Sequence, residues 1–315
     1  MSGGEPTTSG GPEVDVEVRG LTKRFGGVLA VDQLTFSVPP GRVTGFLGPN
    51  GAGKTTTLRM ALGLVSPTAG SATIGGLPYA DLVAPQRIVG AALEATGFHP
   101  GRTGRNHLRI LAATAEVPDR RVDEVLAMVG LTDAARRRTG EYSLGMRQRL
   151  GLAGALLADP RVLLLDEPAN GLDPEGIAWL RGFLRYLAAQ GRTVLVSSHV
   201  LSEVQQTVDD VVIVSRGRLV RASTLAELEG APTVLARSPR AVALVDALRS
   251  AGLDAALDGD VDTGAVRVTN GDPAAVGHAA YGAGIELHEL RAEASDLERI
   301  FLQLTGDPAA PGAPS

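Results

Sequence analysis

The sequence predicts an α/β fold with a parallel β-sheet at its core, followed by a smaller α+β domain. Continuous apolar runs at 162–165, 194–196 and 211–214 are typical of strands that are buried on both faces. Helical patterns separate these runs, which favours parallel strands joined by right-handed crossovers. A glycine-rich loop stands between a strand pattern and a helix pattern in the first part of the chain, and the composition changes near Gly230.

Taken in order, the chain begins and ends with segments of low complexity. Residues 1–13 and the tail 307–315 are rich in Gly, Ser, Thr and Pro, so we expect both segments to be disordered. The first domain, 14–229, opens with an alternating strand pattern at 14–18. Within it, residues 95–159 lack strong strand patterns and are expected to form a mostly helical insertion.

The second domain, 230–306, has an order of patterns that favours a βαββαβ arrangement. Its expected strands are 234–236, 254–257, 265–268 and 285–287, and its expected helices are 240–251, 273–281 and 295–304. This order predicts a small ferredoxin-like sandwich with a final helix after its last strand.

Composition and charge narrow the classes of function. The net charge of −5 argues against generic nucleic-acid binding through a basic surface. The lack of cysteine excludes disulfides, thiolate catalysis and cysteine metal sites. The N-terminus has no signal-peptide pattern, and no apolar run approaches the roughly 20 residues of a membrane helix. We therefore expect a cytoplasmic or peripheral protein, for which any membrane task requires a separate subunit.

The glycine-rich loop carries the most specific chemistry in the chain. It consists of Gly48, Pro49, Asn50, Gly51, Ala52, Gly53, Lys54, Thr55 and Thr56. This spacing between a strand and a helix fits the phosphate-binding pattern G-x-x-x-x-G-K-[ST], in which backbone N–H groups and a helix N-terminus surround phosphate. We expect Lys54 to reach the β- and γ-phosphates and the Thr55 hydroxyl to bind Mg²⁺. The alternative is a glycine-rich turn with a solvated lysine.

Two carboxylates follow the buried strand pattern at 162–165. Asp166 and Glu167 would lie at the carboxyl end of that strand, which is the ligand-binding edge of an open α/β sheet. Asp166 is placed to hold Mg²⁺, and Glu167 is placed to orient and deprotonate an attacking water. The alternative is an acidic strand end that faces solvent. Beside a phosphate loop, the pair favours a site that hydrolyses a nucleoside triphosphate.

The segment 142–149, Tyr-Ser-Leu-Gly-Met-Arg-Gln-Arg, resembles the signature loop of ATP-binding cassette (ABC) ATPases, which is usually written LSGGQ. It has Leu144 and Met146 where the common motif has Gly and Gln. Ser143 suits an N-cap position, and a helical run follows at 148–158. The Ser143 hydroxyl and the Gly145 N–H are placed to meet a γ-phosphate at the start of that helix. The alternative is an ordinary capped helix.

The resemblance implies roles for four further positions. Asp173 matches the D-loop that runs across the dimer interface, and His199 matches the switch histidine that contacts the γ-phosphate. Phe25 matches the aromatic residue that stacks on adenine, and its alternative is a plain core position. Glu94 stands where the family has a Gln that binds Mg²⁺ and responds to the membrane subunit. A carboxylate can still ligate Mg²⁺, but it adds negative charge near the γ-phosphate.

The resemblance covers about 14–229 and implies a P-loop ATPase fold with ATP and Mg²⁺ as ligands. Two copies would form a head-to-tail homodimer, in which each ATP lies between Lys54 of one copy and Ser143 of the other. ATP hydrolysis would drive a separate membrane permease through the surface around 94–106. The chain would then be peripheral on the cytoplasmic face of the cell membrane.

Two further segments resemble one branch of the family. Residues 94–108 and the Ser-Leu-Gly-Met signature are similar to exporters of antibiotics of the daunorubicin and bacitracin kind, and 296–301 resembles the small domain appended to them. We therefore expect the permease to handle a hydrophobic antibiotic or lipid-like cargo, and we expect no nucleic-acid partner. One rival is a soluble ABC ATPase of repair or translation, which usually carries tandem cassettes, coiled coils or zinc modules. Another is a regulatory module with little turnover.

Overall fold

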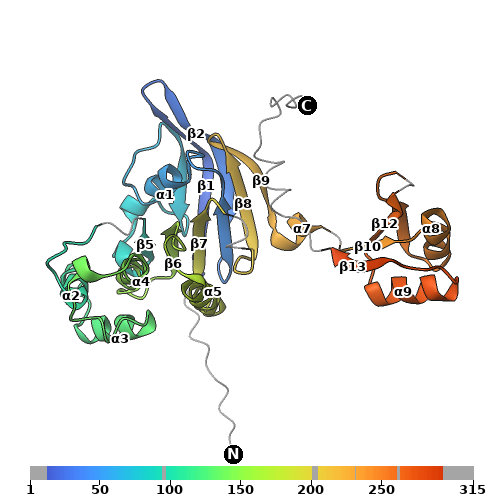
Figure 1. The fold of residues 1–315 in the computed structure, drawn as a ribbon. Helices are drawn as coiled ribbons and strands as arrows, with labels where there is room; N and C mark the ends of the chain where they lie inside the picture. The colour runs from blue at the N-terminus through green and yellow to red at the C-terminus, as the bar shows by residue number, and fades with distance from the viewer. Residues whose placement is uncertain (1–12, 94–96, 201–204, 231, 261–262, 294–315) are drawn as a thin grey trace, which may run out of the picture. The chain divides into compact units, whose positions relative to one another are not determined.

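The structure, a computed structural model, describes residues 13–93, 97–200, 205–230, 232–260 and 263–293. It divides the chain into two compact units, with the boundary between Leu225 and Ala226 (Figure 1). The segments expected to be disordered lie outside the described residues, except for Glu13.

The first unit is built on a six-stranded sheet in the order β5-β6-β7-β3-β8-β9. The strands are β3 (Val43–Leu47), β5 (Val89–Ala92), β6 (Val162–Asp166), β7 (Thr193–Ser198), β8 (Asp210–Ser215) and β9 (Arg218–Thr224). The first five in this order pair in parallel, and β9 pairs antiparallel with β8. Because parallel strands end at a common edge, the carboxyl ends of β3, β6 and β7 lie together. The predicted α/β fold with a parallel core is confirmed.

A smaller antiparallel sheet covers the core of this unit. It has the order β2-β1-β4, with β1 (Val16–Phe25), β2 (Val28–Val38) and β4 (Ala69–Ile74). Its buried valines pack with β3 and with helix α1 (Lys54–Ala61) in one hydrophobic cluster. Phe36 of β2 and Phe46 of β3 have ring centroids 5.2 Å apart. This burial of apolar surface fixes β3 and α1, the two elements that flank the glycine-rich loop.

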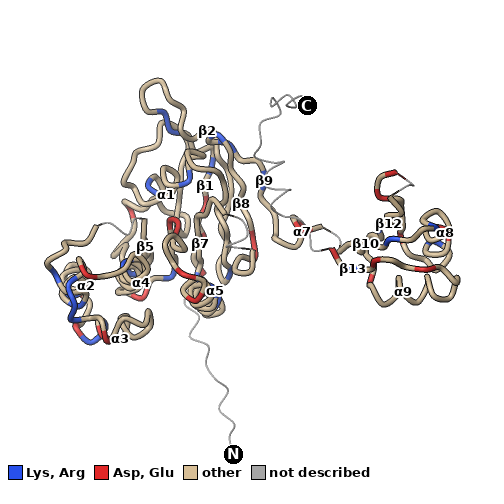
Figure 2. Tube along the Cα trace, viewed as in Figure 1, with Lys and Arg blue, Asp and Glu red and all other residues tan. Residues whose placement is uncertain are grey.

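Further helices lie along the connections between the strands. They are α2 (Gly104–Thr114), α3 (Arg120–Met128), α4 (Leu144–Ala155), α5 (Pro174–Ala189) and α7 (Leu225–Glu229). Short 3-10 turns occupy Tyr79–Asp81, Pro85–Arg87 and Thr139–Glu141. Basic residues are frequent along α2 and α3, where Arg105 pairs with Asp123 at 2.7 Å (Figure 2). None of the described helices is both long enough and apolar enough to span a membrane.

The second unit is an antiparallel sheet with two helices on one face. Its elements are β10 (Thr233–Arg237), α8 (Ala241–Ser250), β11 (Asp254–Leu257), β12 (Ala265–Thr269), α9 (Pro273–Gly282) and β13 (Glu289–Glu293), and the strand order is β11-β12-β10-β13. Leu244, Leu248 and Val276 of the helices pack on Val234 and Val266 of the sheet. Chain order and strand order together describe a ferredoxin-like βαββαβ sandwich.

Several predicted elements differ from the structure. The expected helix at 148–158 begins earlier, at Leu144, because Ser143 caps it. The last strand of the second unit is β13 at Glu289–Glu293 and not 285–287; Ile285 is buried but lies before the strand. The sequence did not predict β4, β5 or β9. The expected helix at 295–304 lies outside the described residues.

Candidate active site

The glycine-rich loop joins β3 to α1 and needs glycine at two positions for steric reasons. A Cβ atom at Gly48 would lie 2.3 Å from the Val214 carbonyl oxygen. At Gly53, φ is +98° and a Cβ would lie 2.6 Å from the Ala30 carbonyl oxygen. Helix α1 begins directly after Gly53, at Lys54. The first four N–H groups of a helix have no partner within the helix, so this N-terminus suits an anion.

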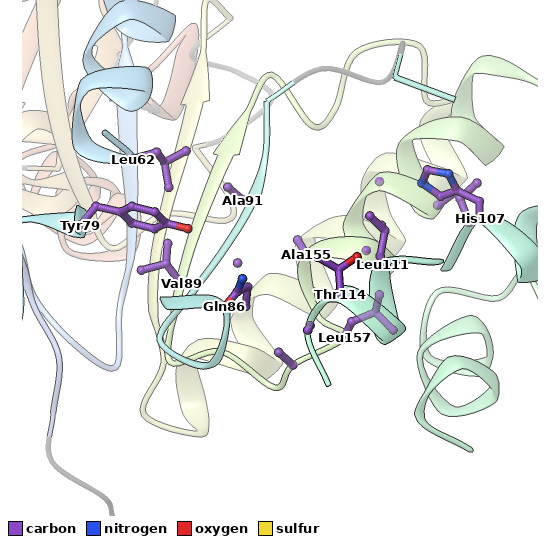
Figure 3. Close-up of a pocket in the computed structure, with 16 residues that line it drawn as sticks. Leu62, Tyr79, Gln86, Val89, Ala91, His107, Leu111, Thr114, Ala155 and Leu157 are labelled. Atoms are coloured by element: carbon purple, nitrogen blue, oxygen red, sulfur yellow. The ribbon is translucent and has the colours of Figure 1, made fainter. Parts of the chain in front are cut away.

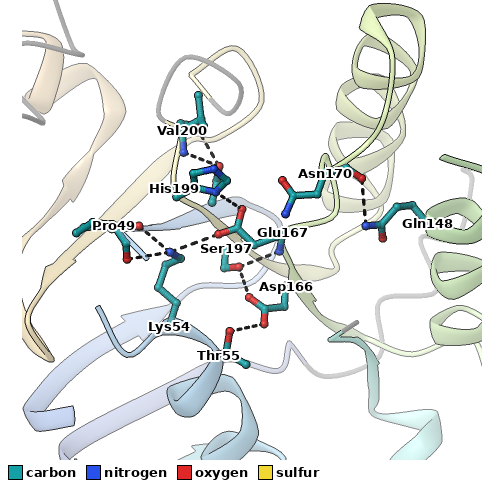
Figure 4. Close-up of polar contacts among 12 residues, drawn as sticks. Pro49, Lys54, Thr55, Gln148, Asp166, Glu167, Asn170, Ser197, His199 and Val200 are labelled. Carbon is teal, nitrogen blue, oxygen red and sulfur yellow. Dashed lines mark hydrogen bonds and ion pairs between the residues drawn. The ribbon is translucent and has the colours of Figure 1, made fainter. Parts of the chain in front are cut away.

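Lys54 lies inside the loop and reaches across to β6. Its side chain is 6% exposed, and Nζ donates to the Gly48 carbonyl at 2.6 Å. Nζ also lies 3.4 Å from the Pro49 carbonyl oxygen and 3.3 Å from Glu167 Oε1 (Figure 4). The ammonium group therefore lies between the loop and the carboxylate of Glu167, the residue that follows β6.

Thr55 and Asp166 form an oxygen pair beside Lys54. The Thr55 hydroxyl donates to Asp166 Oδ2 at 2.6 Å. In the described part of the chain, no group of three or more His, Cys, Asp or Glu side chains could hold a metal ion. Mg²⁺ usually needs only one or two carboxylates together with substrate phosphates and water. A hydroxyl and a carboxylate at this distance, next to a phosphate loop, fit Mg²⁺ in chemical type.

Glu167 joins the lysine to His199. Its Oε2 atom lies 2.8 Å from His199 Nδ1, while Oε1 faces Lys54. An ionised carboxylate only accepts hydrogen bonds, so Nδ1 carries the hydrogen in this contact. His199 follows β7 directly, and Asp166 is the last residue of β6. The structure thus brings together Lys54, Thr55, Asp166, Glu167 and His199, as the sequence predicted.

Ser143, Gly145 and Asp173 lie in a different part of the same unit. Ser143 Oγ accepts from the Met146 N–H at 3.2 Å, which makes Ser143 the N-cap of α4 as predicted. Asp173 Oδ1 likewise accepts from the Gly176 N–H at 2.8 Å and caps α5. Ser143, Gly145 and Asp173 line one hollow of 470 Å³, and the glycine-rich loop does not contribute to its lining.

The start of α4, which carries the signature residues 143–146, also contacts the segment after Glu167. The side chain of Leu144 packs against Gly171, where an added Cβ would lie 2.1 Å from Leu144 Cδ2. The Gln148 amide donates to the Asn170 carbonyl at 3.2 Å (Figure 4). Leu144, which replaces the usual Gly of the motif, therefore fills the space between the start of α4 and the segment 170–173.

The remaining predicted residues are Phe25 and Glu94. Phe25 ends β1 and is 49% exposed, so it is not a core residue, and Lys23 Nζ lies 4.9 Å from the centre of its ring. Glu94 lies outside the described residues.

Sequence reasoning missed Ser197, which contacts the Asp166 carboxylate and the backbone N–H of Glu167. The Ser197 hydroxyl donates to Asp166 Oδ1, and it accepts from the Glu167 N–H at 2.9 Å. The residue is 0% exposed at the end of β7. The only signal in the sequence is a serine two residues before His199, and its contacts depend on the pairing of β6 with β7.

Comparisons with known proteins show which family the chain resembles. A family model described as ABC transporter matches residues 31–170, and a domain of unknown function matches 232–298. The bacitracin transport ATP-binding protein BcrA of Enterococcus faecalis is 41% identical over 219 residues, 69% of this chain and 71% of that protein. The Nod factor export ATP-binding protein I of Burkholderia lata is 39% identical over 235 residues, 72% of this chain and 74% of that protein. A solved ATP-binding subunit of an ABC transporter aligns with a TM-score of 0.62 at 28% identity, covering 68% of this chain and 91% of that one.

Proposed function

The chain belongs to the family of ABC transporter ATP-binding proteins, and from that premise we propose that it hydrolyses ATP at the site around Lys54 to drive transport through a membrane partner. The observation that carries the proposal is the convergence of Lys54, Asp166, Glu167 and His199 (Figure 4). A lysine beside a helix N-terminus binds phosphate, and a partly buried carboxylate next to it can activate water.

Each residue of the site has a defined part in the proposed reaction. The Lys54 ammonium and the N–H groups of the loop stabilise negative charge on the transferred phosphoryl group. Glu167 orients the attacking water and accepts its proton. The His199 contact at 2.8 Å holds the Glu167 carboxylate in place, and we propose that the ring also contacts the γ-phosphate.

Thr55 and Asp166 are the residues that would hold Mg²⁺. When bound, the ion would neutralise charge on the β- and γ-phosphate oxygens. We also propose that Glu94 adds a carboxylate near this position and that Phe25 stacks on the adenine. The half-exposed ring of Phe25 at the end of β1 leaves one surface of the aromatic group available for such a contact.

The arrangement of the loops supports a dimer as the working unit. The glycine-rich loop and the Ser143–Gly145 turn lie in different parts of one unit, and each is suited to bind phosphate. If two copies pack head to tail, Ser143 and Gly145 of one copy face the phosphates held by Lys54 of the other. A closed two-fold dimer satisfies both surfaces at once. Asp173, which caps α5, would then lie at the interface.

A groove in the first unit supports docking of the permease. Its volume is 330 Å³, and its lining is mainly apolar, including Leu62, Val89, Leu111 and Ala155 (Figure 3). Apolar grooves of this kind suit an amphipathic segment of a partner. The lining includes His107 of α2, and we propose that a cytoplasmic segment of the permease binds in this groove. The chain would then work on the cytoplasmic face of the membrane.

The relatives suggest the class of cargo. The names of two similar proteins refer to transport of bacitracin and export of Nod factor. We propose that this chain powers export of a hydrophobic antibiotic or another lipid-like molecule, and that the permease alone contacts this cargo.

Phosphate release by the purified full chain tests the proposal. Wild-type protein should hydrolyse ATP with a rate per molecule that rises with protein concentration, as a dimer requires. Lys54→Ala and Glu167→Gln should each lower the rate at least about tenfold. Glu116→Gln is the matched control, because Glu116 is an exposed acidic residue in the turn after α2, away from the site and the proposed interface. Wild-type rates in both site variants would remove Lys54 and Glu167 from the reaction.

A further inference from the structure

Ser197 contacts both acidic residues of the site, Asp166 through its carboxylate and Glu167 through its backbone N–H, and it has no role in the reaction described above. It is 0% exposed and pairs in register with Asp166 across strands β6 and β7. Its hydroxyl contacts Asp166 Oδ1 and the Glu167 backbone nitrogen (Figure 4). One buried hydroxyl therefore bonds to two consecutive residues, Asp166 at the end of β6 and Glu167 directly after it.

The direction of both hydrogen bonds follows from the chemistry of the groups. A backbone N–H can only donate, so the Ser197 oxygen accepts from Glu167 at 2.9 Å. The single hydroxyl hydrogen is then left for Asp166 Oδ1, because an ionised carboxylate only accepts. The other oxygen of Asp166 accepts from Thr55. Both oxygens of Asp166 thus have a hydroxyl donor, and the rotation of the carboxylate is fixed.

The backbone at Glu167 explains why such a bridge matters. Successive side chains of a strand point to opposite faces, so an extended Asp-Glu pair would direct its two carboxylates apart. Glu167 instead has a φ of +50°, a left-handed conformation that is unfavourable for a residue with a Cβ atom. In this conformation Glu167 reaches Lys54 at 3.3 Å while Asp166 meets Thr55. The Ser197 bond is made to the N–H of the strained residue itself.

We propose that Ser197 is a positioning residue that holds Glu167 in its left-handed conformation and Asp166 against Thr55, and that it thereby sets the rate of ATP hydrolysis. The inference rests on the proposed function, because it deepens the roles given there to Asp166 and Glu167. Ser197 acts through these two carboxylates, whereas the phosphate contacts of Lys54 do not depend on it. Loss of the hydroxyl should therefore affect the chemical step and spare nucleotide binding.

Two variants of equal shape separate the hydroxyl from the space it fills. Ser197→Thr keeps the hydroxyl and adds a methyl group, and Ser197→Val has the same outline without the hydroxyl. In the full chain, we expect kcat of the Val variant to be at least about tenfold below that of the Thr variant. Binding of a fluorescent ATP analogue in EDTA should be no weaker in the Val variant than in the Thr variant, since Lys54 and the loop are unchanged.

Thr44→Val is the control for loss of a buried hydroxyl in general. Thr44 is 0% exposed on β3, the strand beside β7, and its hydroxyl has no hydrogen-bond partner among the described residues. This variant should keep the wild-type kcat. If added bulk at position 197 unfolds both the Thr and the Val variants, Ser197→Ala against wild type gives the same comparison without it, again with a loss of about tenfold expected.

The outcomes distinguish this inference from the proposed function. Equal kcat values for Ser197→Thr and Ser197→Val overturn the positioning role, and so does a matching loss of ATP affinity in the Val variant. If wild type hydrolyses ATP and Lys54→Ala does not, such a result leaves the proposed function intact. If wild type releases no phosphate, the proposed function itself fails.

Discussion

Glu167→Gln should tighten ATP binding while it slows hydrolysis. The Glu167 carboxylate lies 3.3 Å from Lys54 Nζ, and the lysine side chain is only 6% exposed, so solvent screens this ion pair little. A γ-phosphate competes with the carboxylate for the same ammonium group and is repelled by its charge. Both effects disappear when the side chain becomes a neutral amide of the same shape.

The size of the effect follows from these contacts. A hydrogen bond to a charged group contributes about 1.5–3 kcal/mol. Glu167 is 19% exposed and shares its other oxygen with His199 at 2.8 Å, so the lower end of that range applies. About 1.5 kcal/mol corresponds to roughly tenfold in Kd. Hydrolysis should fall at least about tenfold, because the amide cannot accept the proton of the attacking water.

Equilibrium binding measures this affinity without interference from turnover. Fluorescence titration of the full chain with an ATP analogue, in EDTA, gives Kd for wild type, Glu167→Gln and the exposed control Glu116→Gln. The control should leave Kd unchanged, because Glu116 is exposed in the turn after α2 and belongs neither to the site nor to the proposed interface. Equal or weaker binding by Glu167→Gln would refute competition between the carboxylate and the phosphate.

Three other changes have defined outcomes. Gly171→Ala should cost about 1–3 kcal/mol in thermal unfolding, because φ is +75° and the new Cβ would lie 2.1 Å from Leu144 Cδ2; adding Leu144→Gly should recover the steric part. Burial, and then the charge of Arg102, lower the pKa of His107 below its usual 6.5, so the folded state resists protonation. The urea-unfolding free energy should therefore fall as the pH drops below about 6.5, and His107→Gln should flatten that fall. Ending the chain after Gly230 should leave a cooperatively melting protein that binds ATP, and an insoluble product would contradict separate units.

The sequence predicted best where chemistry restricts the choice of residue. The loop that ends in Lys54 and the Asp166–Glu167 pair follow strict spacings, and both lie where the sequence placed them. Strands β5 and β9 escaped prediction for opposite reasons. Strand β5 is Val-Gly-Ala-Ala, which has weak strand propensity and depends on pairing with buried β6. Strand β9 is exposed along most of its length and pairs only with β8 in its sheet, so no apolar alternation marks it.

Other features depend on contacts between distant parts of the chain. Ser197 and Asp166 are 31 positions apart in sequence, and only the register between β6 and β7 brings them together. The backbone conformation of Glu167 is equally hidden, because nothing in Leu-Asp-Glu-Pro demands a positive φ. The apolar residues of 285–287 suggest a strand, but Ile285 packs in the core from the segment before β13. Burial and strand pairing are separate properties, and apolar residues in a sequence indicate burial without indicating strand pairing.

The left-handed backbone at Glu167 sets two kinds of selection against each other. At a φ of +50°, glycine and asparagine have a lower conformational energy than glutamate, so replacement by either relieves strain. Selection for thermal stability therefore disfavours glutamate at this position, whereas selection for turnover favours it. A library screened only for survival at high temperature should accumulate inactive variants at 167, whereas a library screened for growth in the presence of a toxic cargo should keep glutamate. A gene copy released from transport duty would be expected to lose this residue early.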